Sequence, residues 1–173
     1  TGVGNVGERL LKQIEQQQDY LKKQLNINMR VLGLSNSRKM AIDENGIDLS
    51  NWKALLEEGT PVTLDSFHSA VVELNQRNSI FVDITANADV AAMYGKYLKQ
   101  SIAVVACNKI ACSSDYDKYN ELKHLSKTYN APLLFETNVG AGLPIIDTLN
   151  NLIASGDRVK RIQAVLSGSL NFV

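Results

Sequence analysis

The sequence predicts an α/β fold, with a doubly wound parallel sheet that helices cover on both faces. Four continuous apolar runs have the composition of buried strands: 29–34, 80–84, 102–106 and 132–135. Amphipathic segments lie between these runs, which is the pattern of parallel strands joined by crossover helices. The chain has 173 residues, 45% of them hydrophobic, which is enough for one domain and part of a second.

The helices are predicted from apolar spacing and from capping residues. Apolar side chains recur at helical spacing over Asn5–Leu25, which predicts a long first helix. Ser50 and Asp65 are candidate N-caps for two shorter helices, which end near Gly59 and Arg77. Further helices are predicted over 88–98, 114–129 and 143–154, and residues 36–50 have the composition of a loop.

The end of the chain predicts the start of a second domain. Residues 159–166 alternate apolar and polar side chains, as in a half-exposed strand of a separate sheet. We therefore expect a dinucleotide-binding domain over 1–138 and the beginning of an α+β substrate and dimerisation domain over 139–173. A doubly wound fold has its first strand at the sheet centre, whereas this chain opens on a helix. The first strand is thus expected to precede Thr1.

Composition narrows the class of protein. Eighteen basic residues balance eighteen acidic ones, which argues against electrostatic binding to nucleic acid or to an anionic membrane. No apolar run approaches the ~20 residues of a spanning helix, and no leader pattern opens the chain. Two cysteines cannot form a disulfide framework, and the two histidines lack metal-ligand spacing. We expect a cytoplasmic protein.

The segment Gly2-Val3-Gly4-Asn5-Val6-Gly7 has the spacing G-x-G-x-x-G at the start of the first helix. Gly2 permits a tight turn, Gly4 lets a pyrophosphate approach the backbone, and Gly7 lets the helix pack closely on its strand. Glycines collected in an ordinary loop are the alternative. The helix and buried strand that follow favour a Rossmann-like dinucleotide site.

The end of the next predicted strand indicates which dinucleotide is bound. NAD sites usually place an acidic residue there to bond the ribose hydroxyls. This chain instead has Ser35 near the expected ribose position, followed by Arg38 and Lys39, which can neutralise a 2′-phosphate. The pattern favours NADP, with NAD as the alternative if the two cations are simply solvated.

Two later strand ends carry further candidates, because ligands of open α/β sheets bind beyond the carboxyl ends of the strands. Thr85 is a candidate hydrogen-bonding partner of the cofactor, and Asp83 is interpreted as a loop cap. Asn108 and Lys109 follow the next strand. Desolvation of the Lys109 ammonium would lower its pKa and suit it to proton transfer; a plain surface lysine is the alternative.

The glycine-rich segment 136–144 is a candidate metal site. Carbonyl oxygens of an irregular backbone, together with the Glu136 carboxylate, suit a hard cation. A helix-entry loop with Pro144 near the first turn is the plainer interpretation.

Together these motifs resemble homoserine dehydrogenase, and most of all the dehydrogenase half of bifunctional aspartokinase–homoserine dehydrogenases. The resemblance runs in order along the whole chain and is carried by Gly2–Gly7, Ser35–Lys39, Asp83–Thr85, Asn108–Lys109, Glu136–Pro144 and Leu166–Asn171. It implies hydride transfer between L-homoserine and L-aspartate 4-semialdehyde with NAD(P), in threonine and methionine synthesis. It also implies a homodimer or higher oligomer and an aspartokinase domain in the parent chain.

The resemblance assigns roles to particular residues. Asn5 and Val6, with the glycines, would hold the pyrophosphate; Ser35 and Thr85 would line the cleft, and Lys109 would lie between nicotinamide and substrate. Ser169 would lie near both. The family's sodium site would be formed by Glu136 and the backbone oxygens of Val139, Ala141 and Leu143. The family's substrate carboxylates and proton-transfer lysine fall beyond Val173, so we expect the 173-residue chain alone to be inactive or nearly so.

Two other functions fit parts of the pattern. Aspartate-semialdehyde dehydrogenase needs a nucleophilic cysteine, and Cys107 and Cys112 follow a strand without a histidine at a convincing spacing. A non-catalytic nucleotide-sensing module would also use a Rossmann-like domain. The fold alone does not distinguish these functions.

Overall fold

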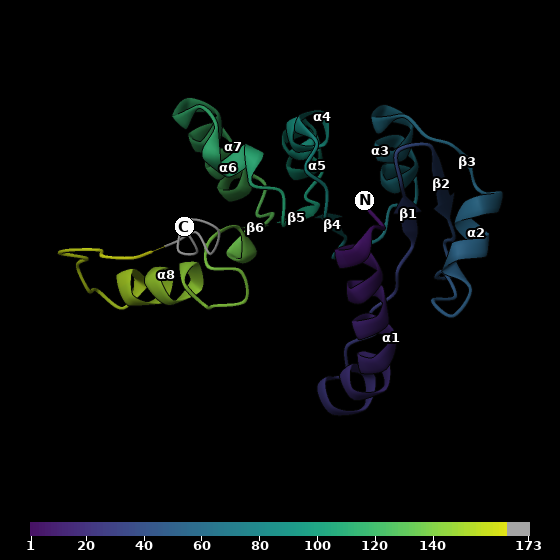
Figure 1. Ribbon diagram of the computed structural model, residues 1–173, viewed down its shortest axis with the longest axis horizontal. Helices are drawn as coiled ribbons and strands as arrows, with labels where there is room; N and C mark the ends of the chain where they lie inside the picture. The colour runs from purple at the N-terminus through teal and green to yellow at the C-terminus, as the bar shows by residue number, and fades with distance from the viewer. Residues whose placement is uncertain (166–173) are drawn as a thin grey trace.

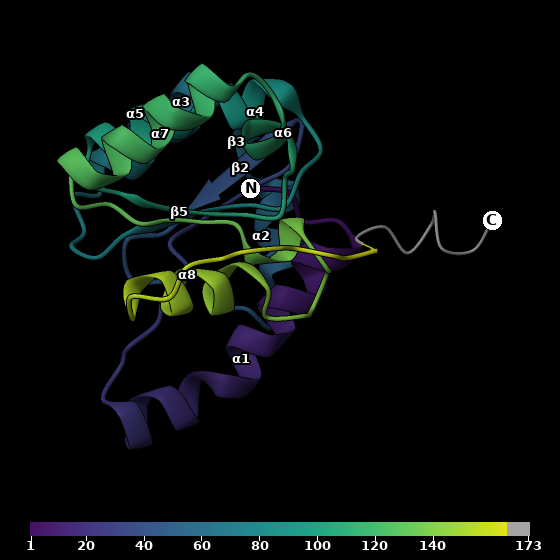
Figure 2. The same ribbon diagram turned by 90° about the vertical axis from the view of Figure 1, so that its left-hand side faces the viewer.

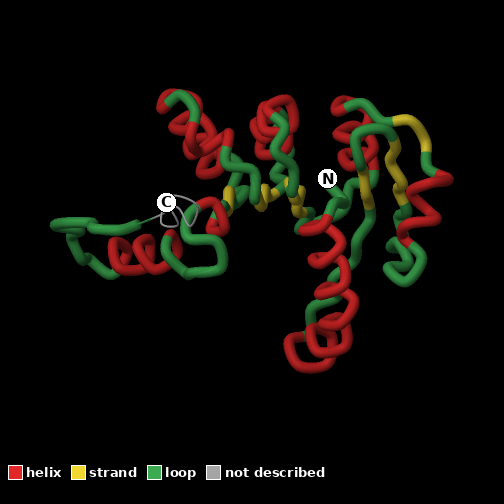
Figure 3. The backbone as a smooth tube through the Cα atoms, in the orientation of Figure 1, coloured by secondary structure: helices red, strands yellow, loops and turns green. Residues whose placement is uncertain are grey.

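The computed structural model describes residues 1–165. Six short strands cross the middle of the molecule in two sheets of three (Figures 1 and 3). One sheet is antiparallel and has the order β1 (Gly33–Ser35), β2 (Lys39–Ile42) and β3 (Thr60–Pro61). The other is parallel and has the order β4 (Ile80–Asp83), β5 (Ala103–Ala106) and β6 (Leu133–Leu134). The predicted α/β class with a parallel sheet is confirmed.

Helices cover both faces of the strands, as Figures 1 and 2 show from two directions. On one side lie α3 (Leu64–Glu73), α4 (Ala88–Ala92), α5 (Tyr94–Lys99), α6 (Ile110–Ser113) and α7 (Tyr116–Thr128). On the other side lie α1 (Asn5–Leu25) and α8 (Ile146–Ala154), while α2 (Trp52–Glu58) packs beside β2. Among residues 1–165, no helix is both long and apolar enough to cross a membrane.

Two apolar cores follow this division. The larger core joins the parallel sheet to the helices above it, with Phe81 stacked on Tyr97 at its centre. The smaller core joins α1 and α2 to the antiparallel sheet through Leu11, Leu34 and Leu56. The predicted first helix is confirmed to the residue; Asn26 ends it in the left-handed conformation, at φ 53°.

The two sheets meet at Thr1 and Gly2. The Thr1 amino group donates to the Val82 carbonyl at 2.6 Å, and the Ile84 amide donates to the Thr1 carbonyl at 3.0 Å. On the other side, the Gly2 amide donates to the Ser35 carbonyl at 3.0 Å. The start of the chain is therefore a seam that hydrogen-bonds to both β1 and β4.

The antiparallel hairpin β1–β2 corrects the sequence-based prediction in two ways. The predicted strand over 29–34 is reduced to β1, and β2 lies in the segment that was predicted to be a loop. The Asn36 side chain accepts hydrogen bonds from the backbone amides of Arg38 and Lys39, both at 2.8 Å. This turn reverses the chain, so β1 pairs with its own continuation.

Other differences concern helix ends and the C-terminal segment. Thr63 and Ser66 form a reciprocal capping box, so Thr63 rather than Asp65 caps α3, and Asn51 rather than Ser50 precedes α2. The predicted strand at 159–166 is wrong over 159–165, which have no regular structure and are exposed. Its alternating pattern has no partner strand among residues 1–165, and a strand forms only where its backbone groups are paired.

Candidate dinucleotide-binding site

The turn Gly2–Gly7 is folded closely on itself and on the strand beside it. Gly2 has φ +88°, and a Cβ there would lie 2.8 Å from the Ile84 carbonyl oxygen. A Cβ on Gly7 would lie 2.2 Å from the Gly2 carbonyl oxygen. Gly4 differs, because nothing lies within 4 Å of its Cβ position. The turn thus packs tightly on one side and leaves the backbone of Gly4 open on the other.

A pocket of about 640 Å³ opens beside this turn. Its lining comes from the turn (1–4), the β1–β2 hairpin (35–37), the entry to α3 (62–64) and the loop after β4, with Thr85 and Asn87. The pocket lies at the carboxyl ends of β1 and β4, where open α/β sheets bind ligands. The first turn of α1 adds unpaired backbone amides and a positive dipole end, which favour an anion.

The pocket brings together some of the predicted residues and not others. Gly2, Val3, Gly4, Ser35 and Thr85 line it, whereas Asn5, Val6 and Gly7 follow in the first turn of α1. Ser35 is 2% exposed, and its hydroxyl donates to the Thr1 hydroxyl at 2.7 Å. That hydroxyl therefore faces the seam between the sheets. Ser169 lies outside the described residues.

The two cations of the hairpin have different surroundings. Arg38 is exposed immediately after Ser37, the last hairpin residue in the pocket lining. The Lys39 ammonium donates to the Glu57 carbonyl in the last turn of α2, where the helix dipole favours a positive charge. Arg38 is consequently better placed than Lys39 to reach a group bound in the pocket.

A buried polar cluster joins the loops after β4 and β5. Asp83 is fully buried and accepts hydrogen bonds from the Thr85 amide at 2.8 Å, the Tyr94 hydroxyl at 2.6 Å and the Asn108 side-chain amide at 3.0 Å. Asn108 also donates to the Asn87 carbonyl at 2.9 Å. The interpretation of Asp83 as a loop cap is confirmed at Thr85 but is incomplete. Tyr94 lies eleven positions further on, and no spacing pattern in the sequence connects it with Asp83.

Lys109 follows this cluster as the residue before α6, and its side chain is exposed. The desolvation expected from its place after a buried strand is therefore not observed. Its backbone carbonyl accepts from the amides of Cys112 and Ser113 at 3.2 and 3.0 Å. The residue is held firmly at its backbone while its ammonium group faces solvent.

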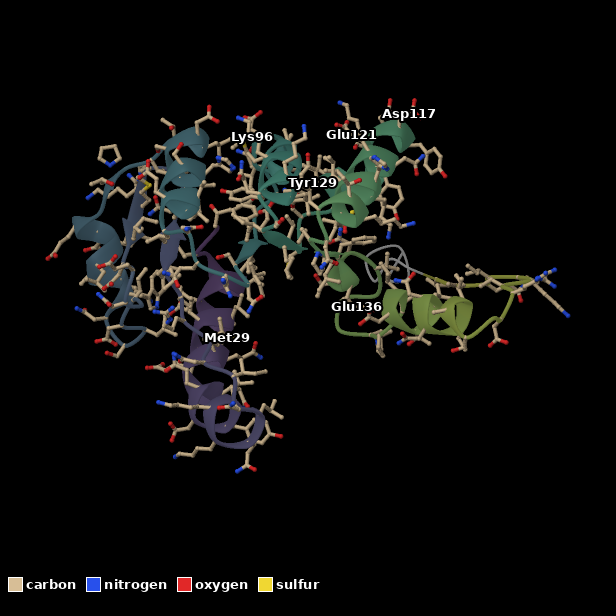
Figure 4. The ribbon with its side chains drawn as sticks, turned by 180° about the vertical axis from the view of Figure 1, so that it is seen from behind. Met29, Lys96, Asp117, Glu121, Tyr129 and Glu136 are labelled. Carbon is tan, nitrogen blue, oxygen red and sulfur yellow. The ribbon has the colours of Figure 1, made fainter. Side chains whose placement is uncertain are left out.

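Glu136 begins a 3₁₀ turn (η1, Glu136–Asn138) and caps α8 (Figure 4). One carboxylate oxygen accepts from the amides of Ile145 and Ile146 at 2.5 and 2.9 Å, and the other accepts from Asp147 at 2.8 Å. The Leu143 carbonyl, another expected sodium ligand, also accepts from the Ile145 amide, at 3.0 Å. The Glu136 and Leu143 oxygens thus already serve the first turn of α8, whereas the sodium site that the resemblance implies, with the carbonyls of Val139 and Ala141, stays a prediction.

Replacing Glu136 with alanine removes this cap. We expect the free energy of unfolding to fall by about 1–2 kcal/mol, because the amides of Ile146 and Asp147 lose their acceptor and that of Ile145 loses one of its two. Glu136→Gln, which keeps an acceptor oxygen, should lose less. Urea denaturation and hydrogen exchange at residues 145–147 measure the effect. Unchanged exchange in Glu136→Ala, or a gain in wild-type stability specific to sodium over potassium, would contradict the capping role.

The sequence of the chain is similar to those of known proteins with a dinucleotide-binding domain. Residues 2–136 match the family described as "Homoserine dehydrogenase, NAD binding domain". The chain is 42% identical to a bifunctional aspartokinase/homoserine dehydrogenase of Haemophilus influenzae, over 99% of this chain and 21% of that protein. It is 34% identical to homoserine dehydrogenase of Schizosaccharomyces pombe, over 99% of this chain and 46% of the relative. The chain therefore spans less than half the length of these relatives.

The solved structures agree in fold. A hyperthermophilic archaeal homoserine dehydrogenase in complex with NADPH superposes with a TM-score of 0.69 at 26% identity, over 88% of this chain and 47% of that one. The enzyme of Thermoplasma acidophilum gives the same TM-score at 19% identity, over 89% of this chain and 47% of that one, and supports the fold alone. Since the family match covers more than half of the sequence, the chain belongs to the homoserine dehydrogenase family and contains its NAD-binding domain.

Proposed function

We propose that this chain holds NADP(H) for a homoserine dehydrogenase that interconverts L-homoserine and L-aspartate 4-semialdehyde in threonine and methionine synthesis. The observation that carries the proposal is the open backbone of Gly4 beside the pocket, at the positive end of α1. The pyrophosphate is assigned to that open face, and the adenosine half to the pocket between the hairpin and α3. Bound there, the dinucleotide supplies the hydride acceptor or donor.

The chain's own residues position the two reactants. Thr85 lines the pocket at the carboxyl end of β4, and Lys109 follows Asn108 at the carboxyl end of β5. Loss of the hydroxyl proton during oxidation of the alcohol would leave negative charge on the substrate oxygen. We assign the Lys109 ammonium to the substrate oxygen at this edge of the sheet, where it stabilises negative charge on that oxygen.

The proposal is tested by measuring homoserine oxidation with the full-length protein that contains this chain. We expect turnover with NADP⁺ by the full-length protein and none, or nearly none, by residues 1–173 alone. NADPH should still bind to the 173-residue chain, which fluorescence titration can measure. Turnover by the short chain would contradict the expectation that the remaining catalytic residues lie beyond Val173, and absence of turnover in the full-length protein would contradict the function.

The preference for NADP is proposed to depend on Arg38. Arg38→Ala should weaken NADPH binding about tenfold, since one charged contact to a phosphate is lost. NADH binding should change by less than about twofold, because NADH has no 2′-phosphate. Lys39→Ala is the matched control, since the Lys39 ammonium is bound to α2, and it should have the smaller effect. An equal loss for both dinucleotides in Arg38→Ala would reject this role.

The assembly and location are proposed from the relatives. Because relatives at about 40% identity are named as bifunctional enzymes, we propose an aspartokinase domain in the parent protein. A homodimer or higher oligomer and a cytoplasmic location are proposed with it; the Arabidopsis thaliana relatives are named chloroplastic. The thioester chemistry of the semialdehyde enzyme is disfavoured at Cys112, because burial raises the pKa of its thiol.

A further inference from the structure

Asp83 is a buried carboxylate that the proposed reaction does not use directly. It is 0% exposed, and Asn108 beside it is 2% exposed. Its three hydrogen-bond donors come from three elements: the loop after β4, helix α5 and the loop after β5. An apolar side chain of similar size would fill this position without the cost of desolvating a charge. The buried charge therefore costs free energy of folding that an apolar residue would not, which suggests a role in ordering the segments that the cluster contacts.

The cluster fixes the backbone of the loops after β4 and β5. Asp83 orders the loop after β4 through the Thr85 amide, and Thr85 lines the pocket. Asn108 joins the two loops, because its side chain donates to Asp83 and Asn87 and accepts from the Ile110 amide at 3.1 Å. Lys109 lies between Asn108 and Ile110, so its backbone is held on both sides.

Tyr94 attaches this arrangement to the helical layer. Its side chain is buried in α5, and its hydroxyl donates to Asp83. Burial, together with the neighbouring Asp83 carboxylate, raises the pKa of the Tyr94 hydroxyl far above its ordinary value. The hydroxyl therefore keeps its proton and remains a donor throughout the physiological pH range.

We infer that Asp83 and Tyr94 are positioning residues, which set the placement of Thr85 and Lys109 relative to each other at the carboxyl edge of the parallel sheet. The inference rests on the proposed function. Neither side chain needs to touch the cofactor, because each acts through the loops it holds. Hydride transfer is sensitive to such placement, since a displacement of about 1 Å can cost on the order of a hundredfold in rate.

The test compares two tyrosine-to-phenylalanine variants in the full-length enzyme. Tyr94→Phe removes only the hydroxyl that Asp83 accepts from. Tyr119→Phe is the matched control: Tyr119 lies partly buried against Phe135, and its hydroxyl has no hydrogen-bond partner within residues 1–165. Tyr94→Phe should lower kcat about tenfold, whereas its affinity for adenosine 2′,5′-bisphosphate should change by less than about twofold. The control should change neither quantity.

A second measurement separates the possible failures. Amide exchange at Thr85 and Ile110 should be faster in Tyr94→Phe than in Tyr119→Phe, whether or not the enzyme turns over homoserine. Equal kcat and equal exchange in the two variants would overturn the positioning role. Wild-type enzyme that binds adenosine 2′,5′-bisphosphate but does not oxidise homoserine would overturn the proposed function, and exchange would then decide whether the cluster orders the two loops.

Discussion

Replacing Gly7 with alanine is expected to disrupt the dinucleotide site and to lower the free energy of unfolding by about 3 kcal/mol. The added Cβ would lie 2.2 Å from the Gly2 carbonyl oxygen, far inside van der Waals contact. The obstacle is backbone that hydrogen-bonds to β1, so it cannot move aside without breaking the seam. Urea denaturation measures the stability change, and fluorescence titration measures the loss of NADPH binding.

Gly4→Ala is the matched control and should give the opposite pattern. Gly4 has φ −74°, which alanine adopts without strain, and nothing lies within 4 Å of its Cβ position. We expect stability to change by less than about 0.5 kcal/mol. Binding should nevertheless weaken at least about tenfold, because the methyl group occupies the face assigned to the pyrophosphate. Wild-type affinity in Gly4→Ala would place the pyrophosphate elsewhere.

The second large effect is a dependence of stability on pH. Burial lowers the pKa of the Thr1 amino group from 8.0 to about 6, and the nearby Asp83 charge only partly opposes this shift. Between these values the unfolded chain binds more protons than the folded one. In the isolated 173-residue polypeptide, where the Thr1 amine is free, the free energy of unfolding should therefore rise by about 3 kcal/mol from below pH 6 to above pH 8. A peptide bond before Thr1 in a longer protein removes this titrating group. Denaturation midpoints across this range measure it.

Acetylation of Thr1 provides the control for this prediction. An acetylated amine keeps an N–H that can donate to the Val82 carbonyl, but it carries no charge and does not titrate. The rise in stability between pH 6 and 8 should then largely disappear. A rise of the same size in the acetylated chain would assign the effect to other groups.

The elements that sequence predicts well are those whose signal is local. Helix α1 has a continuous amphipathic pattern, and β4 and β5 are continuous apolar runs paired in a parallel sheet. The hairpin β1–β2 depends instead on a side-chain turn at Asn36 within a polar segment. The exposed segment 159–165 has a strand-like pattern but no partner, and pattern alone does not supply one.

The candidate site divides in the same way. The glycine turn was found because its spacing has a direct steric reason, and the structure puts tight contacts at Gly2 and Gly7 and open space at Gly4. The hydrogen bond between Asp83 and Tyr94 corresponds to no recognisable spacing in the sequence, because it joins the end of a strand to a helix through the core. For Glu136 the sequence leaves a cation site and a helix-entry loop open, and its carboxylate accepts hydrogen bonds from the start of α8, as the loop interpretation predicts.

Because the seam at Thr1 and Gly2 joins the two sheets, dinucleotide binding beside it is expected to affect the stability of the whole domain. The peptide units that join the β1 hairpin to the parallel strands lead directly into the turn to which we assign the pyrophosphate. A ligand bound to that turn stabilises the contact between the antiparallel and the parallel sheet. Binding therefore raises the free energy of local unfolding of either sheet alone. Without ligand, the two halves should unfold locally and independently of each other, and with ligand they should open together. The rigidity of the domain then depends on the concentration of the coenzyme.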